Sequence, residues 1–496
     1  MKLNLAFKIG IAIALLLVIL TWPVSVQPQP NRLGSLESYI KQELETTRVP
    51  GAAIAVIQGN QPIYLQGFGK ADPSGRMVTA DTPFIMGSLS KSFTALAVMQ
   101  LVEAGRIQLD EPVQRYLDWF SFADPQASAK ITVRQVLNQT TGISWIDGLS
   151  FLSSRDASAD AIKRRVRALK QVTPTTQPGQ TFQYSNVNYD IAGALIEAVT
   201  DQPYETYVQE HIFNPLGMQH SFASKTIAAR NGLATGYRYW FGQPIADANL
   251  PYSRSELASF LLISTAEDMG KYLAAHLNQG RYDSKQILSP ARMAELHQGA
   301  AATPWGDAYA MGWFDEQWEG VRVLNHFGSF AGYHANMAIA PERNLGLVML
   351  TNAESYVCND RRWEIAKNAF RSLLGQDIRQ KSNVSASCIA PWGIGLLLVF
   401  LAVNMMTTVR RVRHWLRYPQ PLRISTTILL PFLLHMSLAT FLLMGVPRLF
   451  EATLPAVLLT TPDAGWLLLL GGIFAFAWGM IRAILMTVLY KKQSIG

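Results

Sequence analysis

Three long apolar runs near the end of the chain constrain its fold more than any other feature. They cover residues 389–409, 424–446 and 465–490. Each reaches the length of roughly 20 residues that a helix needs to cross a hydrocarbon core of about 30 Å. Buried helices of a soluble core are the alternative, but three such runs so close together favour a membrane. We therefore predict a membrane domain with three transmembrane helices at 389–496.

Basic residues beside these runs predict their orientation. Four arginines lie within 410–417, Arg423 follows them, and two lysines at 491–492 come after the last run. Short basic loops stay in the cytoplasm, whereas the loop 448–463 holds one Arg, one Glu and one Asp. We therefore expect the arginine-rich loop in the cytoplasm and residues 30–388 outside it.

The amino-terminal segment has the pattern of a targeting sequence. Lys2 and Lys8 precede an apolar stretch at 9–20, which is typical of a secretory signal. No clear small-residue cleavage site follows, so an uncleaved membrane anchor fits equally well. We expect residues 1–30 to be one or the other, and both place the following domain outside the cytoplasm.

The net charge of +8 is concentrated at the two ends of the chain. From Cys388 onward there are nine Lys/Arg and two Asp/Glu, and Lys2 and Lys8 lie at the start. The part between is close to neutral, so a nucleic-acid-binding face, which needs clustered positive charge, is not expected. The two cysteines are Cys358 and Cys388; a disulfide between them and two free thiols both stay open.

Residues 31–375 have the pattern of one domain whose sheet is built from both of its ends. The expected elements are a helix at 33–46, strands at 52–57 and 62–68, helices at 88–103 and 189–199, and strands at 333–340 and 345–350. Gly59 and Asn60 between the first two strands are a hairpin signal. The middle is mostly helical, which predicts a helical lobe, and the polar stretch 376–388 is expected to be a linker to the membrane.

The segment 87–91, GSLSK, carries the first chemical signal. A Ser–x–x–Lys pair at the start of a helix puts Ser88 and Lys91 on one face, one turn apart. A lysine that loses its proton in a buried site can act as the base for such a serine. The pattern alone is weak, because Ser38 and Lys41 repeat it on a charged, solvated helix face.

Two further motifs follow along the chain. Tyr184 and Asn186 belong to a Tyr–Ser–Asn run before the helix at 189–199. A tyrosine between lysine and substrate can relay a proton to a leaving group, and the asparagine can hold the lysine and a substrate amide. The run 326–329, HFGS, would let a substrate backbone lie alongside a small glycine at a strand edge. Each motif alone is more typical of an ordinary turn or strand end.

Together the three motifs match the order of Ser–x–x–Lys, Ser/Tyr–x–Asn and Lys–Thr–Gly in penicillin-recognising enzymes. Over about residues 35–375 the chain resembles the serine β-lactamase-like and penicillin-binding-protein family, with its class C β-lactamases, D-alanyl-D-alanine carboxypeptidases and esterase relatives. Further familial segments are 49–53, 84–105, 214–218 and 264–269. The resemblance implies a two-lobed α/β (α+β) fold, an antiparallel sheet flanked by helices plus a helical lobe.

The resemblance also implies roles for individual residues. Ser88 would be the acylated nucleophile, Lys91 its partner and Tyr184 the general acid/base. Asn186 would contact the lysine and the substrate. The backbone N–H groups of Ser88 and Ser329 would form the oxyanion hole. No metal or other cofactor is implied.

The third motif departs from the family pattern at His326. Lactamases and carboxypeptidases usually have lysine there, whereas esterase-like and peptidase-like relatives often carry histidine. Together with Gly328, His326 is expected to contact the substrate. A histidine with a reference pKa of about 6.5 is mostly neutral at pH 7, so its attraction for a substrate carboxylate is weaker and pH-dependent. The departure argues against efficient β-lactam hydrolysis.

These signals predict a membrane-anchored, extracytoplasmic serine hydrolase with an acyl-enzyme on Ser88. Its substrates would be peptides or esters, such as cell-wall D-Ala peptides, or β-lactam-like amides. The alternative is a membrane-tethered receptor or scaffold without turnover; intact Ser88, Lys91 and Tyr184 favour the enzyme. The sequence has no Gly-x-Ser-x-Gly elbow and no clustered histidine ligands, which disfavours an α/β-hydrolase and a metallohydrolase. The expected partners are a small substrate and the lipid bilayer, with no nucleic acid.

Overall fold

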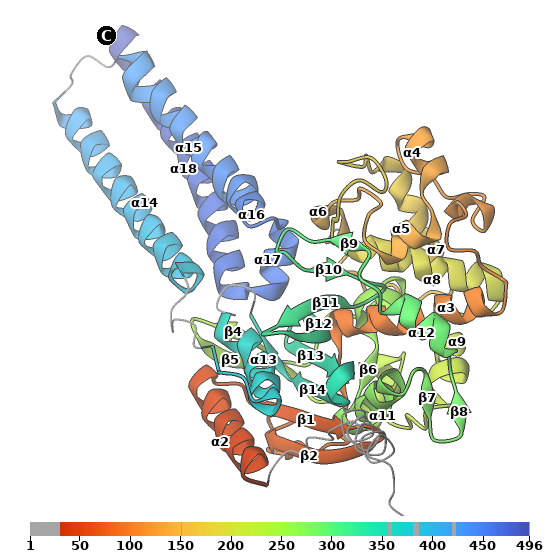
Figure 1. The fold of residues 1–496 in the computed structure, drawn as a ribbon. Coiled ribbons are helices and arrows are strands. Elements are labelled where there is room, and N and C mark those ends of the chain that lie inside the picture. Colours follow the sequence, from red (N-terminus) through yellow and green to blue (C-terminus); the bar gives the residue numbers. More distant parts are fainter. Residues whose placement is uncertain (1–29, 150, 356–359, 380–385, 419–422, 496) are drawn as a thin grey trace, which may run out of the picture.

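The computed structural model describes residues 30–149, 151–355, 360–379, 386–418 and 423–495. The expected signal sequence therefore lies outside the described residues except for Pro30, and so does Cys358. The disulfide between Cys358 and Cys388, one of the two alternatives for these cysteines, therefore falls outside the described residues as well. An antiparallel sheet lies at the centre of the domain before the linker, and a helical bundle follows the linker (Figure 1).

Among the described residues, eight strands form the central sheet, and its neighbouring strands are all antiparallel. Their spatial order is β2 (Gln61–Gly69), β1 (Gly51–Gln58), β14 (Leu345–Thr351), β13 (Tyr333–Ala340), β12 (Val321–Phe330), β11 (Phe314–Trp318), β10 (Ala308–Tyr309) and β9 (Ala301–Ala302). β1 pairs with β14, and Ala55 lies opposite Val348. Strands from both ends of the domain thus share one sheet, as the sequence predicts.

Helices cover both faces of this sheet. α2 (Pro30–Thr47) and α13 (Asp360–Leu374) pack on one face, and α11 (Ala266–Leu277) packs on the other. Successive residues of a strand point to opposite faces. Accordingly, Ile54 of β1 belongs to the core under α2 and α13, and Ala55 belongs to the core on the side of α11. Burial on both faces explains the nearly continuous apolar sequence of β1.

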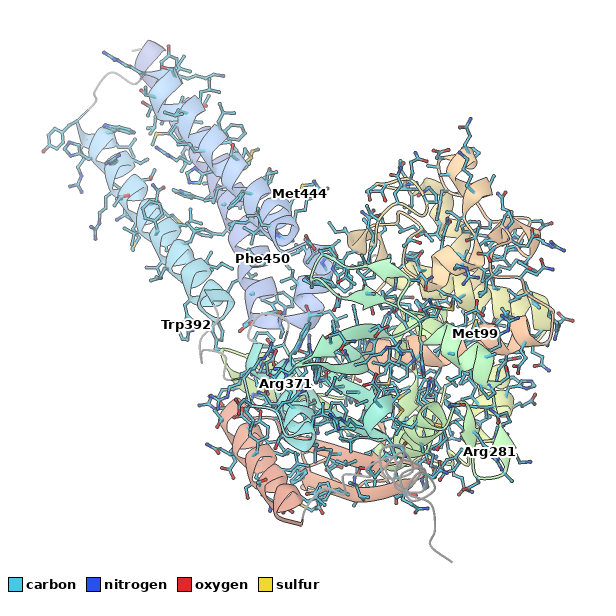
Figure 2. All side chains as sticks on the ribbon, in the orientation of Figure 1. Met99, Arg281, Arg371, Trp392, Met444 and Phe450 are labelled. Atoms are coloured by element: carbon cyan, nitrogen blue, oxygen red, sulfur yellow. The ribbon has the colours of Figure 1, made fainter. Side chains whose placement is uncertain are left out.

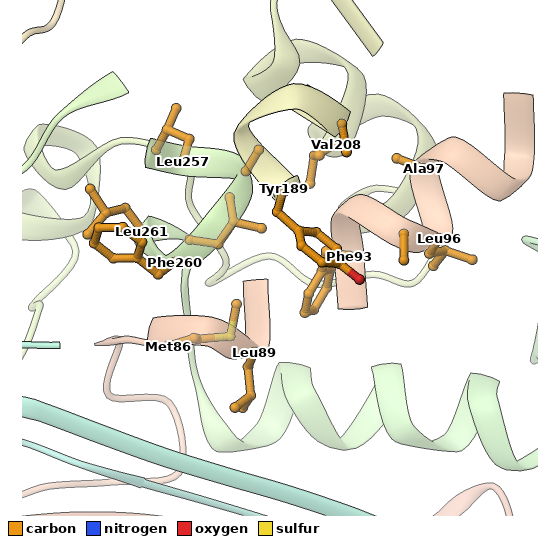
Figure 3. Close-up of a cluster of buried hydrophobic side chains, with 14 of the residues drawn as sticks. Met86, Leu89, Phe93, Leu96, Ala97, Tyr189, Val208, Leu257, Phe260 and Leu261 are labelled. Atoms are coloured by element: carbon orange, nitrogen blue, oxygen red, sulfur yellow. The ribbon is translucent and has the colours of Figure 1, made fainter. Parts of the chain in front are cut away.

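The helical lobe is built around α3 (Ser90–Glu103). This helix is buried nearly all round, and α8 (Asn186–Thr200) and the π-helical segment Leu257–Leu261 pack against it. Phe93 of α3 and Tyr189 of α8 are completely buried in this cluster (Figure 3). The two helices that start with the site motifs therefore meet in one rigid core.

In the described part of the chain after the linker, three helices are long and apolar enough to cross a membrane. They are Trp392–Arg417, Ser425–Leu449 and Pro462–Lys492, and they coincide with the three apolar runs of the sequence. Figure 1 shows them projecting together away from the sheet. Many of their large apolar side chains are exposed (Figure 2), which is the surface that a lipid-facing bundle presents.

The bundle is also docked on the sheet domain. Arg238 of β4 (Gly236–Trp240) donates hydrogen bonds to two carbonyl oxygens of α17 (Leu454–Thr460), at 3.1 and 3.3 Å. The backbone N–H of Phe241 donates to Asp463 Oδ2 at 2.8 Å. These contacts hold the bundle against the domain in addition to the covalent linker.

Candidate active site

Ser88 lies in a tight turn that leads into a buried helix. The turn is the 3₁₀ segment Gly87–Leu89, and α3 follows directly at Ser90. Gly87 has φ +56°, and a Cβ there would come within 2.5 Å of the backbone nitrogen of Ser329. Only glycine fits here without strain, because the backbone is left-handed and a neighbouring strand leaves no room for a side chain. The result is a half-buried Ser88 at the amino end of a helix, where the dipole favours negative charge.

Lys91 is the buried partner of Ser88. Its Nζ lies 3.0 Å from Ser88 Oγ, 2.7 Å from Asn186 Oδ1 and 2.9 Å from the carbonyl oxygen of Ser259. Burial lowers the pKa of Lys91 to about 7, against the opposing effect of two nearby carboxyl groups. A neutral amine has two N–H donors and one lone pair. It can donate to Asn186 and Ser259 while it accepts the Ser88 hydroxyl proton.

The start of α8 brings Tyr184 and Asn186 to the same place. Asn186 is the first residue of the helix and Ser185 is its cap residue. The centroid of the Tyr184 ring lies 4.9 Å from Lys91 Nζ. Gln139 Oε1 accepts a hydrogen bond from the backbone N–H of Ser185 at 2.9 Å and so holds the turn. One helix start therefore presents both the phenol and the amide to the lysine.

The carboxyl-terminal part of β12 closes the site. The ladder with β11 stops before residues 326–330, so β13 is the only described strand that pairs with them. A Cβ on Gly328 would lie 2.0 Å from the carbonyl oxygen of Met86. The missing side chain lets β12 lie directly against the turn that carries Ser88. The backbone nitrogens of Ser88 and Ser329 both lie beside this close approach of Gly87 and Gly328.

Residues 36–369 match the family model described as Beta-lactamase. The chain belongs to the beta-lactamase family. The matched range includes the sheet, the helical lobe and all the site residues described above. The fold class and the family resemblance predicted from the three motifs are thus confirmed.

Three relatives are 27–29% identical to this chain over the aligned residues. Protein flp from Staphylococcus aureus (strain MW2) is 27% identical over 331 residues, 64% of this chain and 63% of that protein. Unguisins hydrolase ungD' from Aspergillus campestris (strain IBT 28561) is 29% identical over 333 residues, 64% and 60% of the two chains. The chain thus spans less than two thirds of the length of these curated relatives. The octameric penicillin-binding protein homologue from Pyrococcus abyssi has a similar structure, with a TM-score of 0.60 and 27% identity over 70% of this chain and 78% of that chain.

His326 of this beta-lactamase-family chain is completely buried. Its Nδ1 lies 2.7 Å from the carbonyl oxygen of Phe327, and its Nε2 lies 3.2 Å from the hydroxyl of Tyr309. Because a carbonyl oxygen only accepts, Nδ1 carries the proton and Nε2 accepts from Tyr309. Burial lowers the pKa of His326 to about 3, and Lys91 acts in the same direction. A neutral histidine with both nitrogens engaged has no spare N–H to donate to a substrate carboxylate. The contact between His326 and the substrate stays a prediction.

Two buried carboxyl groups behind Lys91 are not part of any motif. Asp190 Oδ1 accepts from Ser259 Oγ at 2.6 Å, and Asp190 Oδ2 lies 3.2 Å from Arg165 Nε. Burial, with a smaller contribution from Asp190, raises the pKa of Glu256 to about 8. Charged residues are rarely buried without a partner, so an acidic residue inside the apolar α8 is the sequence signal that points to this network. Negative charge on Asp190 and Glu256 raises the pKa of Lys91.

Replacing Glu256 with glutamine should shift the pH dependence of kcat/KM toward lower pH. Negative charge on Glu256 raises the pKa of Lys91, so its removal lets the free amine persist in more acidic solution. With a pKa of about 8, Glu256 is mostly protonated at pH 7 and carries only part of a negative charge there, so the expected shift is small, under about one pH unit. The measurement is the pH profile of kcat/KM, with the exposed Glu210→Gln as control. An unmoved acid limb in Glu256→Gln would contradict the coupling.

Gly328→Ala should damage the site more than the fold. The added methyl would lie 2.0 Å from the Met86 carbonyl oxygen and 3.0 Å from Ser88 N, so β12 has to move away and take the Ser329 N–H with it. Overpacking of this kind costs about 1–3 kcal/mol. We expect covalent labelling of Ser88 to slow roughly tenfold or more, while circular dichroism reports a folded protein. Gly34→Ala, whose methyl meets nothing within 4 Å, is the control and should label at the normal rate.

Proposed function

We propose that this chain is a membrane-anchored serine hydrolase that forms an acyl-enzyme on Ser88. The observation that carries the proposal is the 3.0 Å contact between Lys91 Nζ and Ser88 Oγ in a site that lowers the pKa of the lysine to about 7. An ordinary lysine, with a pKa of about 10.4, is protonated at neutral pH and has no lone pair to offer. The proposed substrates are peptides or esters, including cell-wall D-Ala peptides and β-lactam-like amides.

The first half-reaction transfers the acyl group to the enzyme. Lys91 Nζ takes the hydroxyl proton while Ser88 Oγ attacks the carbonyl carbon. The negative charge that develops on the carbonyl oxygen is stabilised by the backbone N–H groups of Ser88 and Ser329. The bond to the leaving alcohol or amine then breaks, and the leaving group receives the proton from Lys91 through the Tyr184 hydroxyl. The acyl group is left as an ester of Ser88.

The second half-reaction consumes one water molecule. Lys91 and Tyr184, now without the transferred proton, accept a proton from the water as its oxygen attacks the ester carbonyl. The bond to Ser88 Oγ breaks, and the proton returns to that oxygen. The acid product leaves, and the side chains regain their starting protonation states.

Two further observations support a hydrolase. One relative is named a hydrolase. The side chains of Ser88, Tyr184 and Asn186 surround Lys91 Nζ. The neutral, doubly hydrogen-bonded His326 supports substrates that are not selected by a carboxylate, such as esters and amides. It therefore supports esters and neutral amides over substrates that carry a carboxylate, among them β-lactams and peptides that end in D-Ala.

The test uses the purified full chain and three substrate panels: esters, D-amino-acid peptides and β-lactams. We expect turnover of at least one ester or peptide, and covalent labelling of Ser88 by a fluorophosphonate probe. Tight binding of a panel member with neither turnover nor labelling would instead identify a receptor without catalysis, and it would refute the hydrolase.

The topology of the anchor gives a separate prediction. The arginines of 410–417 and the lysines 491–492 should keep their loops in the cytoplasm. A tag after Gly496 should therefore resist protease added to intact cells, whereas the domain before Gln376 should be digested. Both parts should be digested once the membrane is dissolved. The opposite pattern in intact cells would refute the extracytoplasmic orientation.

A further inference from the structure

An apolar cavity of about 180 Å³ lies between the helical lobe and the bundle. Its lining includes Trp145, Leu149 and Leu152 on the lobe side and Phe450, Ala456 and Leu468 on the bundle side. Protein interiors are close-packed, and an apolar cavity of about 150 Å³ is large enough to bind benzene. The cavity therefore has room for several carbon atoms of an apolar ligand.

One short helix separates this cavity from the catalytic residues. α6 (Trp145–Gly148) contributes the Trp145 ring to the cavity wall, and the same ring lies 5.6 Å from the ring of Tyr184. At the other end of α6, a Cβ on Gly148 would lie 3.0 Å from the backbone nitrogen of Asn186. A ligand in the cavity would thus lie against the same helix that packs on the start of α8.

The bundle side of the wall belongs to the ends of the candidate membrane spans. Ser425–Leu449 ends and Pro462–Lys492 begins beside the cavity, and α17 lies between them. In a bilayer this level is the boundary between hydrocarbon and head groups. An amphiphile at that boundary keeps its chain in the apolar layer and its polar part in water.

We propose that the cavity receives the acyl chain of a membrane amphiphile whose ester or amide group is presented to Ser88. The proposal rests on the hydrolase function and narrows its substrate class to amphiphiles drawn from the bilayer. The chain enters between α6 and α17, and the polar part of the molecule passes Trp145 to reach Tyr184 and Ser88. The contacts of Arg238 and Asp463 hold the bundle against the sheet domain.

A cavity-filling variant tests the chain site by kinetics. Full-length protein in detergent micelles is assayed with 4-nitrophenyl acetate and 4-nitrophenyl dodecanoate. Burial of each methylene contributes about fourfold to binding. Ala456→Phe should therefore lower the ratio of kcat/KM for dodecanoate to that for acetate roughly tenfold. Ala477→Phe, the same change at an exposed position of α18 (Pro462–Ile495), should leave the ratio unchanged, and an unchanged ratio in Ala456→Phe would overturn the proposal.

A binding measurement tests the same site without turnover. A dodecyl amphiphile with a diazirine at the end of its chain is irradiated with the full-length protein in phosphatidylcholine vesicles. We expect cross-links in peptides that contain residues 145–152 or 454–468, and their loss in Ala456→Phe. Cross-links confined to outward-facing residues such as Phe476 would overturn the cavity as a chain site. Absence of acetate turnover and of Ser88 labelling would instead overturn the hydrolase function, so the two failures are distinguishable.

Discussion

Replacing Ser88 with alanine should abolish covalent labelling and lower kcat/KM by roughly 10³-fold or more. Without Oγ there is no atom to form the acyl bond, and only binding and the oxyanion donors remain. The fold should persist, because Ser88 is half-buried and Lys91 keeps its contacts with Asn186 and Ser259. The measurements are fluorophosphonate labelling, kcat/KM and thermal unfolding of the same samples.

The chain carries its own control for this experiment. Ser38 and Lys41 repeat the Ser–x–x–Lys pattern, but Ser38 is exposed and the Lys41 ammonium lies 2.6 Å from a Glu37 carboxylate oxygen. The Ser38 hydroxyl donates to the carbonyl oxygen of Gly34 at 3.0 Å, so this serine is hydrogen-bonded to its own helix and the Lys41 ammonium is engaged by a carboxylate. Ser38→Ala should therefore label and turn over normally. Labelling that survives in Ser88→Ala would contradict the assignment of the nucleophile.

Lys91→Met should lower kcat/KM by roughly 10²- to 10⁴-fold, the range expected for loss of a general base. In the wild type, activity should rise with pH through about 7, because Lys91 is protonated below its pKa of about 7 and becomes a free amine above it. The methionine variant should lose this rise along with its rate. The measurement is the pH profile of kcat/KM between pH 5 and 9.

The matched control is Lys41→Met, which removes a lysine from the exposed pair with Glu37. It should keep both the wild-type rate and the wild-type pH profile. A Lys91→Met variant that retained the acid limb near pH 7 would show that another group supplies the base. Tyr184 would then be the first residue to examine.

Much of the sheet could be predicted because its long strands have local signals. The apolar runs at 52–57 and 345–350 read as buried strands, and their pairing follows from the need of each to bury both faces. The two-residue strands β9 and β10 have no comparable pattern. Their place at the edge of the sheet depends on aromatic contacts such as the one between Tyr309 and Phe314, which a linear sequence does not display.

The sequence predicts the site residues that share one short motif. It does not predict those that come from distant segments and meet only in the folded chain. Ser88 and Lys91 are one helical turn apart, so their contact follows from helix geometry. Asp190 and Glu256 lie far along the chain from Lys91 and approach it from α8 and from the 3₁₀ turn Arg254–Glu256. The protonation state of His326 likewise depends on complete burial and on Tyr309 from another strand.

β1 cannot pair with β14 until the ribosome has made the chain between them. Gln58 lies opposite Leu345, and at about 5–20 residues per second the ribosome needs roughly 15–60 s to make the chain between them. During that interval β1 has only β2 beside it, and its other edge is open. An open apolar edge is a template for pairing with another chain. Nascent chains halted before residue 345 should therefore be the ones that aggregate, and those halted after β14 should stay soluble.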